Sequence, residues 1–207
     1  MGLAQRVTTP MTVDEFRTWA DRQPGRWELV DGQPRAMSLA SSTHGFIQAR
    51  AAYLVERHIE ASGSPCRSAT EPPVIPAAYK RHNARAPDLA VTCAPPSDDW
   101  ELMRPVFLLE ILSPTNERDT RDNVWAYMTI PSVRQILLVD STAVRGEMLR
   151  RGDDGAWPEE PVLLGPDDAI TIDAIGFSCP LRDLYARTHL VEPSTEWGIT
   201  QPQPRRT

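Results

Sequence analysis

Two acidic residues in apolar surroundings constrain the fold of this chain more than any other feature. Asp88 is the second residue of the run Pro87 to Val91, and Glu110 lies inside the otherwise apolar run Val106 to Leu112. Runs as apolar as these are typical of buried strands, and an ionised carboxylate is costly to bury unless a cation compensates it. A divalent metal ion with oxygen ligands can compensate two nearby acids at once. The sequence therefore predicts that Asp88 and Glu110 together bind Mg²⁺ or Mn²⁺.

Hydrophobic periodicity and turn residues predict an alternation of helices and strands along the chain. Thr12 and Glu15 form a capping-box pattern, and Asp31-Gly32 is typical of a two-residue type I′ turn. We expect, in order, a helix over 12–22, a hairpin over 26–37, a helix over 44–62, strands over 66–74, 88–93 and 105–112, a helix over 116–130, strands over 134–140, 145–150, 162–164 and 170–172, and a short helix over 180–186.

These elements predict an α/β (α+β) fold. The helix over 116–130 should act as a crossover that makes the Glu110 strand and the strand over 134–140 parallel. The result would be a mixed sheet flanked by helices, with an N-terminal helix and hairpin and a small C-terminal β addition. If the Asp88 and Glu110 strands pair antiparallel, the two acids can face each other. We expect residues 1–190 to form one domain and the proline-rich residues 191–207 to be a loosely ordered tail.

Composition narrows the class of protein. The 207 residues contain no apolar run near the ~20 residues that cross a bilayer, and the first eleven lack the apolar core of a secretion signal. Cys66, Cys93 and Cys179 are far apart and form no Cys-x-x-Cys pair, so we expect reduced thiols in a cytoplasmic protein without a zinc site. Because the net charge is −6, any surface that binds phosphates can be basic only locally. Lys80 is the only lysine, so such a surface would consist of arginines.

The residues around the acid pair resemble the PD-(D/E)xK nuclease pattern: Pro87-Asp88 matches its first element, and Glu110-Ile111-Leu112 stands where its second would be. More closely, the chain resembles the Uma-two family of restriction-endonuclease-like proteins over about residues 11–140. The pieces that carry this resemblance are Trp27 to Gly32, His44-Gly45, Arg85 to Leu89, Leu109 to Pro114, and Trp125-Ala126-Tyr127 through Leu138-Val139-Asp140. The resemblance implies a restriction-endonuclease-like fold, a divalent metal ion at Asp88 and Glu110, and a phosphodiester substrate.

The chain departs from the nuclease pattern at its lysine. The pattern has lysine two residues after the second acid, where this chain has Leu112. In the Uma-two family a lysine on the following helix, four residues before the tyrosine, takes that role, and here Asn123 occupies the position. Asparagine can orient a water molecule but carries no charge, so Arg121 or Lys80 would have to supply one.

Glu28 and His44 are further candidates for the site. Glu28 could be a third carboxylate near the metal ion, or it could form a cross-strand ion pair with Arg26 or Arg35. His44 follows Ser41-Ser42-Thr43 at a helix start, where it could contact a phosphate or simply cap and pack the helix. On the helix over 116–130, we expect Asp119 and Asp122 to be a solvated acidic turn, and Trp125 and Tyr127 to be core residues.

Together these features predict a metal-dependent endonuclease whose catalytic residues are Asp88, Glu110, Glu28, His44 and Asn123. The metal ion would activate the attacking water and neutralise charge on the phosphate. The expected substrate is nucleic acid, with DNA favoured, and a homodimer is expected by analogy with enzymes that cut two strands. The rival interpretation is a catalytically inactive nuclease fold that serves binding or assembly, favoured by the missing lysine and the acidic net charge. A third is a hydrolase of small phosphoesters.

Overall fold

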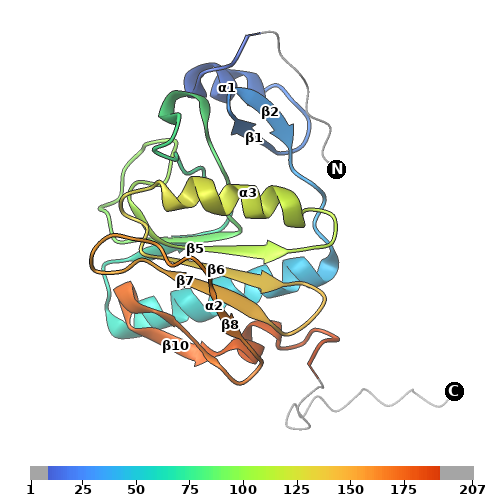
Figure 1. Ribbon diagram of the computed structural model, residues 1–207, viewed down its shortest axis with the longest axis vertical. Coiled ribbons are helices and arrows are strands. Elements are labelled where there is room, and N and C mark those ends of the chain that lie inside the picture. The colour runs from blue at the N-terminus through green and yellow to red at the C-terminus, as the bar shows by residue number, and fades with distance from the viewer. Residues whose placement is uncertain (1–8, 192–207) are drawn as a thin grey trace, which may run out of the picture.

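The computed structural model describes residues 9–191, and its centre is a mixed sheet (Figure 1) that has six strands. The strand order is β3 (Arg67–Ala69), β4 (Leu89–Thr92), β5 (Pro105–Leu112), β6 (Gln135–Asp140), β7 (Gly146–Arg150) and β8 (Val162–Leu164). Strands β5 and β6 are parallel and every other neighbouring pair is antiparallel. The crossover between β5 and β6 is α3 (Glu117–Met128), which confirms the predicted parallel pair.

Two helices cover opposite faces of this sheet, and alternate residues of β5 show which face each helix covers. Phe107, Leu109 and Ile111 belong to the apolar cluster that contains the buried residues of α2 (Ser42–Ser62). Leu108 and Leu112 belong to the cluster that contains the buried residues of α3. Successive side chains of a strand point to opposite faces. Glu110 therefore lies on the α3 face. Asp88 lies on the same face, because it is two residues before Ala90, which belongs to the α3 cluster.

An N-terminal unit lies at the top of the view in Figure 1, where α3 separates it from β5. It consists of α1 (Val13–Ala20) and a separate hairpin of β1 (Trp27–Val30) and β2 (Gln33–Ala36). The predicted capping box is present, because Glu15 N donates to Thr12 Oγ1 at 3.3 Å and Thr12 N donates to Glu15 Oε2 at 2.7 Å. The predicted type I′ turn is also present, with positive φ angles at Asp31 (49°) and Gly32 (78°).

The C-terminal part adds a second hairpin, β9 (Ala169–Ile172) with β10 (Phe177–Pro180), and short 3₁₀ turns at Asp173–Ile175 and Leu181–Tyr185. Its buried side chains belong to the α2 cluster, so this hairpin extends the core on the α2 side of the sheet. The sequence predicted β9 but missed β10, which contains Pro180. A third 3₁₀ turn, Lys80–His82, precedes β4. Within residues 9–191 no helix is both long enough and apolar enough to cross a bilayer.

Three predictions need correction. The strand predicted over 66–74 is ordered as a strand only at Arg67–Ala69, because Pro72 and Pro73 cannot donate ladder hydrogen bonds there. The reduced state predicted for all three cysteines is wrong for Cys66 and Cys93, which form a disulfide, whereas Cys179 is free. Trp125 is not a core residue, because 71% of it is exposed, while Tyr127 is fully buried as expected. The tail predicted at 191–207 lies outside the described residues except for Val191.

Candidate functional site

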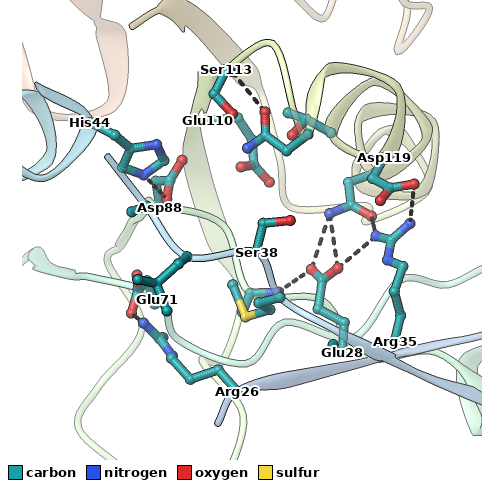
Figure 2. Close-up of a pocket in the computed structure, with 18 of the residues that line it drawn as sticks. Arg26, Glu28, Arg35, Ser38, His44, Glu71, Asp88, Glu110, Ser113 and Asp119 are labelled. Atoms are coloured by element: carbon teal, nitrogen blue, oxygen red, sulfur yellow. Dashed lines mark hydrogen bonds and ion pairs between the residues drawn. The ribbon is translucent and has the colours of Figure 1, made fainter. Parts of the chain in front are cut away.

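A cavity of about 280 Å³ opens where the carboxyl end of β5 meets the first turns of α2 and α3 (Figure 2). One wall comes from the hairpin β1–β2 and the segment that follows it, and the other from β5, the start of β4 and the two helices. The five residues that the sequence predicted as catalytic all line this cavity: Glu28, His44, Asp88, Glu110 and Asn123. Chain segments that are far apart in the sequence are therefore brought to one place.

The register of β4 against β5 places the two predicted metal ligands across from each other. Leu89 pairs with Leu109, so the next residues outward are Asp88 and Glu110. Both carboxylates are buried, with 6% and 5% of each residue exposed. The backbone N–H of Ile111 donates to Asp88 Oδ2 at 2.7 Å, and Tyr127 Oη donates to Glu110 Oε1 at 2.6 Å. The acids thus share one face of the sheet, as the antiparallel pairing requires.

Burial and the nearby charge of Asp88 perturb Glu110. The pKa of Glu110 lies well above its ordinary value, first because burial disfavours the carboxylate and second because the charge of Asp88 is close by. The hydrogen bond from Tyr127 works in the opposite direction and lowers the pKa of Glu110. The pKa of Tyr127 is itself raised, by burial and then by the charge of Glu110. A cation between the two carboxylates would relieve this repulsion.

A divalent ion with few protein ligands fits this donor set. Among residues 9–191 no three His, Cys, Asp or Glu side chains are arranged to hold a metal ion by themselves. Mg²⁺ is commonly bound through only one or two carboxylates and completes its coordination with water and substrate phosphate. Two buried carboxylates that face a cavity, held by a histidine, a backbone N–H and a tyrosine, match this requirement.

His44 supports Asp88 from the first turn of α2. The hydroxyl of Ser41 caps this helix by accepting from His44 N at 3.2 Å. Across the cavity wall, His44 Nε2 lies 2.9 Å from Asp88 Oδ1, and His44 is 5% exposed. Gln48, one turn further along α2, donates to the backbone oxygen of Asp88 at 3.0 Å. Helix α2 therefore fixes both the side chain and the backbone of Asp88.

Glu28 is held by protein donors on both of its oxygens. Glu28 Oε1 accepts from Ala86 N at 3.0 Å and from Asn123 Nδ2 at 3.0 Å. Glu28 Oε2 accepts from Arg35 Nη2 at 2.6 Å, and Arg35 stands directly opposite Glu28 in the hairpin register. This is the cross-strand ion pair that the sequence left open as the alternative. A place for Glu28 near a metal ion stays a prediction.

Asn123 lies at the centre of the same hydrogen-bond network. Asn123 is only 6% exposed, and its Oδ1 accepts a hydrogen bond from Arg35 Nη2 at 2.6 Å. Neither of the two cations that the sequence offered in its place lines the cavity. Arg121 instead binds Glu147 and Glu117 on the outer side of α3, and Lys80 is exposed in the 3₁₀ turn before β4.

The cation that does line the cavity beside Asn123 is Arg35, which sequence reasoning named only as an ion-pair partner. Its position could have been read from the hairpin. A two-residue turn at Asp31-Gly32 pairs Val30 with Gln33. Two positions further from the turn, the same register places Arg35 opposite Glu28. The tyrosine that holds Glu110 was expected only as a core residue. Its hydroxyl contact depends on how α3 crosses the sheet, which the sequence pattern does not specify.

Two helix N-termini also open on the cavity. The lining residues there are His44 in the first turn of α2, Asn116 at the N-cap of α3 and Thr120 in the first turns of α3. The N-terminus of a helix carries a partial positive charge and favours anions. The cavity therefore places two helix ends that favour anions beside the acid pair, and Glu28, Glu71 and Asp119 also line it.

Comparisons with known proteins bear on the family and the fold of the chain. A family model, Uma2, described as "Putative restriction endonuclease", matches residues 13–182. An uncharacterised protein of Synechocystis sp. is 28% identical over 180 residues, which cover 84% of this chain and 91% of that protein. The crystal structure of a "putative nuclease belonging to DUF820" from Anabaena variabilis has a TM-score of 0.66 at 18% identity, and covers 85% of this chain and 98% of that one. This structural likeness confirms the predicted fold class.

Proposed function

Because the chain belongs to the Uma2 family of restriction-endonuclease-like proteins, we propose that it is a nuclease that hydrolyses phosphodiester bonds of nucleic acid with the help of a divalent metal ion. The observation that carries this proposal is the convergence of Asp88 and Glu110 on one cavity, from two strands whose register sets them opposite each other. DNA is the substrate we favour, and a homodimer is the assembly we favour, since cutting two strands takes two active sites.

Asp88 and Glu110 would hold Mg²⁺ or Mn²⁺. When bound, the ion would activate a water molecule and neutralise charge that develops on the phosphate. The residues of the chain supply the rest of the site. The imidazole of His44 and the N–H of Ile111 fix the two oxygens of Asp88, and the Tyr127 hydroxyl fixes one oxygen of Glu110. Carboxylates held in this way need little reorganisation when they bind a cation.

The substrate phosphate would lie between the acid pair and the opposite wall of the cavity. The first turns of α2 and α3 favour an anion at that place. The walls also restrict the space available, because the cavity of about 280 Å³ is large enough for a phosphate group with adjoining atoms but not for a whole duplex. Asn123 of α3 lines the cavity where this helix meets the hairpin, and its amide can orient a water molecule there.

The test is cleavage of a panel of single-stranded and duplex DNA and RNA in titrations with Mg²⁺ and Mn²⁺. The native chain is compared with Asp88→Asn and Glu110→Gln, which keep the shape of each side chain. Loss of a direct ligand should reduce cleavage by at least about 100-fold, since loss of an indirect partner already costs about 10- to 100-fold. Asp122→Asn, at an exposed position of α3 outside the cavity, is the matched control and should cleave like the native chain. Cleavage that survives both ligand substitutions would overturn the assignment.

One observation favours a second candidate, a nuclease fold that binds nucleic acid without cutting it. Position 123 carries an uncharged amide where the family resemblance leads us to expect lysine. Under this alternative, a labelled oligonucleotide would bind the native chain, and no product would appear with either metal ion.

Sedimentation of the same samples tests the proposed homodimer.

A further inference from the structure

The wall of the cavity opposite the acid pair carries a partly buried arginine, Arg35, that no assignment above uses (Figure 2). Its side chain extends from β2 across the hairpin face to α3, and 14% of the side chain is exposed. Nη2 donates to Glu28 Oε2 and to Asn123 Oδ1, both at 2.6 Å, and Nη1 lies 3.5 Å from Asp119 Oδ1. Contacts from β1 and from two positions of α3 thus hold one guanidinium group in a fixed place.

Arg35 remains a cation in this place. Burial by itself would lower the pKa of Arg35, but the charge and hydrogen bond of Glu28, and then the charge of Asp119, raise it above its ordinary value. Two N–H groups on Nη2 serve Glu28 and Asn123, and a guanidinium has about five N–H groups in all. Three N–H groups, on Nε and Nη1, therefore remain beyond the two contacts of Nη2 in a residue that lines the cavity. Arginine is also the residue whose planar set of donors best matches phosphate oxygens.

The other basic side chains near the cavity are less suited to this contact. Arg26 also lines the cavity, but it forms an ion pair with Glu71 and half of its side chain is exposed. His44 is directed at Asp88. Arg121 lines a different cavity, with Glu147 and Asp140, on the outer side of α3. Among the basic residues that line the cavity, Arg35 combines burial, a fixed orientation and direct contact with Asn123.

We propose that Arg35 is a catalytic residue of this nuclease, whose guanidinium binds a non-bridging oxygen of the scissile phosphate and stabilises the negative charge that grows there during hydrolysis. The role rests on the proposed function. In the reaction, the water oxygen forms a bond to phosphorus and the bond from phosphorus to the leaving oxygen breaks. One proton of the water passes to solvent, and the leaving oxygen takes up a proton from solvent. Arg35 donates hydrogen bonds throughout and transfers no proton, which suits its high pKa.

Asn123 has a defined part in this arrangement. Its Oδ1 accepts from Arg35, and its Nδ2 donates to Glu28, so the amide holds a cation and an anion side by side. A lysine at position 123 could donate to Glu28 and would bring its own positive charge to the same wall. The positive charge that stabilises the phosphate can therefore come either from Arg35 of the hairpin or from a lysine at position 123 of α3. In this chain it comes from Arg35.

The experiment compares the native chain with Arg35→Gln, Arg35→Lys, and the double variant Arg35→Gln with Asn123→Lys. Removal of one preorganised donor of this kind should lower the maximal cleavage rate by about 100- to 1,000-fold for Arg35→Gln. Arg35→Lys keeps the positive charge but loses the planar guanidinium with its parallel donors, so its cleavage rate should fall less than that of Arg35→Gln. The double variant should recover at least about tenfold over Arg35→Gln, because the charge returns from α3. Arg121→Gln is the matched control and should cleave like the native chain.

Two further readouts separate a catalytic role from a structural one. The Mg²⁺ concentration that gives half-maximal cleavage should stay the same in Arg35→Gln, whereas Asp88→Asn should shift it. With Ca²⁺ in place of Mg²⁺, binding of a fluorescent oligonucleotide should weaken in Arg35→Gln and recover in the double variant. The double variant also keeps a cation beside buried Glu28, so it serves as the folded reference if Arg35→Gln alone loses its thermal transition.

The outcomes distinguish the two proposals. A native chain that cleaves, together with Arg35→Gln that cleaves equally well, overturns the role of Arg35 and leaves the nuclease proposal in place. A folded double variant that shows no recovery over Arg35→Gln also overturns the role of Arg35. A native chain that cleaves no member of the panel overturns the proposed function, and the role of Arg35 falls with it.

Discussion

His44 and Asp88, which are 44 residues apart in the sequence, are joined by a contact of 2.9 Å between His44 Nε2 and Asp88 Oδ1. The contact links the first turn of α2 to the start of β4, and both residues are buried. An imidazole that hydrogen-bonds a carboxylate fixes the direction of its oxygens. In this molecule the carboxylate is one of the two proposed metal ligands, so α2 supports the site as well as the core.

His44→Ala should therefore weaken the use of the metal ion. Loss of a partner behind a ligand typically costs about 10- to 100-fold in metal affinity or activity. The measurement is the Mg²⁺ concentration that gives half-maximal cleavage. His58→Ala is the matched control, because His58 lies further along α2 and contacts Ile175 O instead of the site. An unchanged half-maximal concentration in His44→Ala would contradict this role.

Glu110→Gln should stabilise the metal-free protein at alkaline pH. The pKa of Glu110 is raised in the folded state, by burial first and the charge of Asp88 second, so folding favours the protonated form. In the native chain this stabilising contribution is complete below the ordinary pKa of 4.5 and is lost as pH rises through the folded value. Each pKa unit of the shift corresponds to about 1.4 kcal/mol. Urea unfolding in a chelating buffer should show the advantage of the glutamine variant widening with pH, and a constant difference would contradict it.

Tyr127→Phe should destabilise the protein, and more so at high pH than at low pH. The substitution fills the same space but leaves Glu110 Oε1 without its donor at 2.6 Å, which typically costs about 1–3 kcal/mol for a buried group. The cost should grow as Glu110 ionises, because this hydrogen bond favours its charged form. Tyr185→Phe removes a hydroxyl that donates to the backbone oxygen of Asp140, and is the control for loss of a buried phenol. Equal pH dependence in the two variants would argue against the assignment.

Reduction of the bond between Cys66 and Cys93 should lower stability. The disulfide closes a loop between residues 27 positions apart, and a cross-link of this length typically contributes about 2–4 kcal/mol. Thermal unfolding with and without a reductant should show the loss as a lower midpoint. The double variant Cys66→Ser with Cys93→Ser should have the lower midpoint in both buffers. A native chain whose midpoint does not respond to complete reduction would contradict the prediction.

Much of the fold could be predicted because its signals are local. The Asp31-Gly32 turn, the Thr12 cap and the apolar run of β5 each depend on a few adjacent residues, and each appears where the sequence places it. The disulfide could not be predicted, because it depends on the pairing of β3 with β4. Their register sets Arg67 against Thr92, so Cys66 comes to stand opposite Cys93. An odd number of cysteines with wide spacing does not indicate this pairing.

The five residues predicted as catalytic line one cavity, but the sequence did not predict their contacts. The apolar surroundings of Glu110 and the Pro87-Asp88 start of β4 indicated the acid pair, and antiparallel pairing then places the pair on one face. The partner of Glu28 was left open between two arginines, and the hairpin register selects Arg35. The exposure of Trp125 was missed, because an aromatic close to a buried tyrosine in sequence points to a different side of a helix.

The pairing of Leu89 with Leu109 has a consequence for how related chains can vary in length. The spacing of the acids is set by strand register, so the connection over residues 94–104, which follows the disulfide-bonded Cys93, does not determine it. Insertions and deletions there should be tolerated, whereas one residue added inside either strand would turn a carboxylate toward the α2 side. Gaps in relatives that retain the acid pair should therefore collect in this connection and be missing from the two strands.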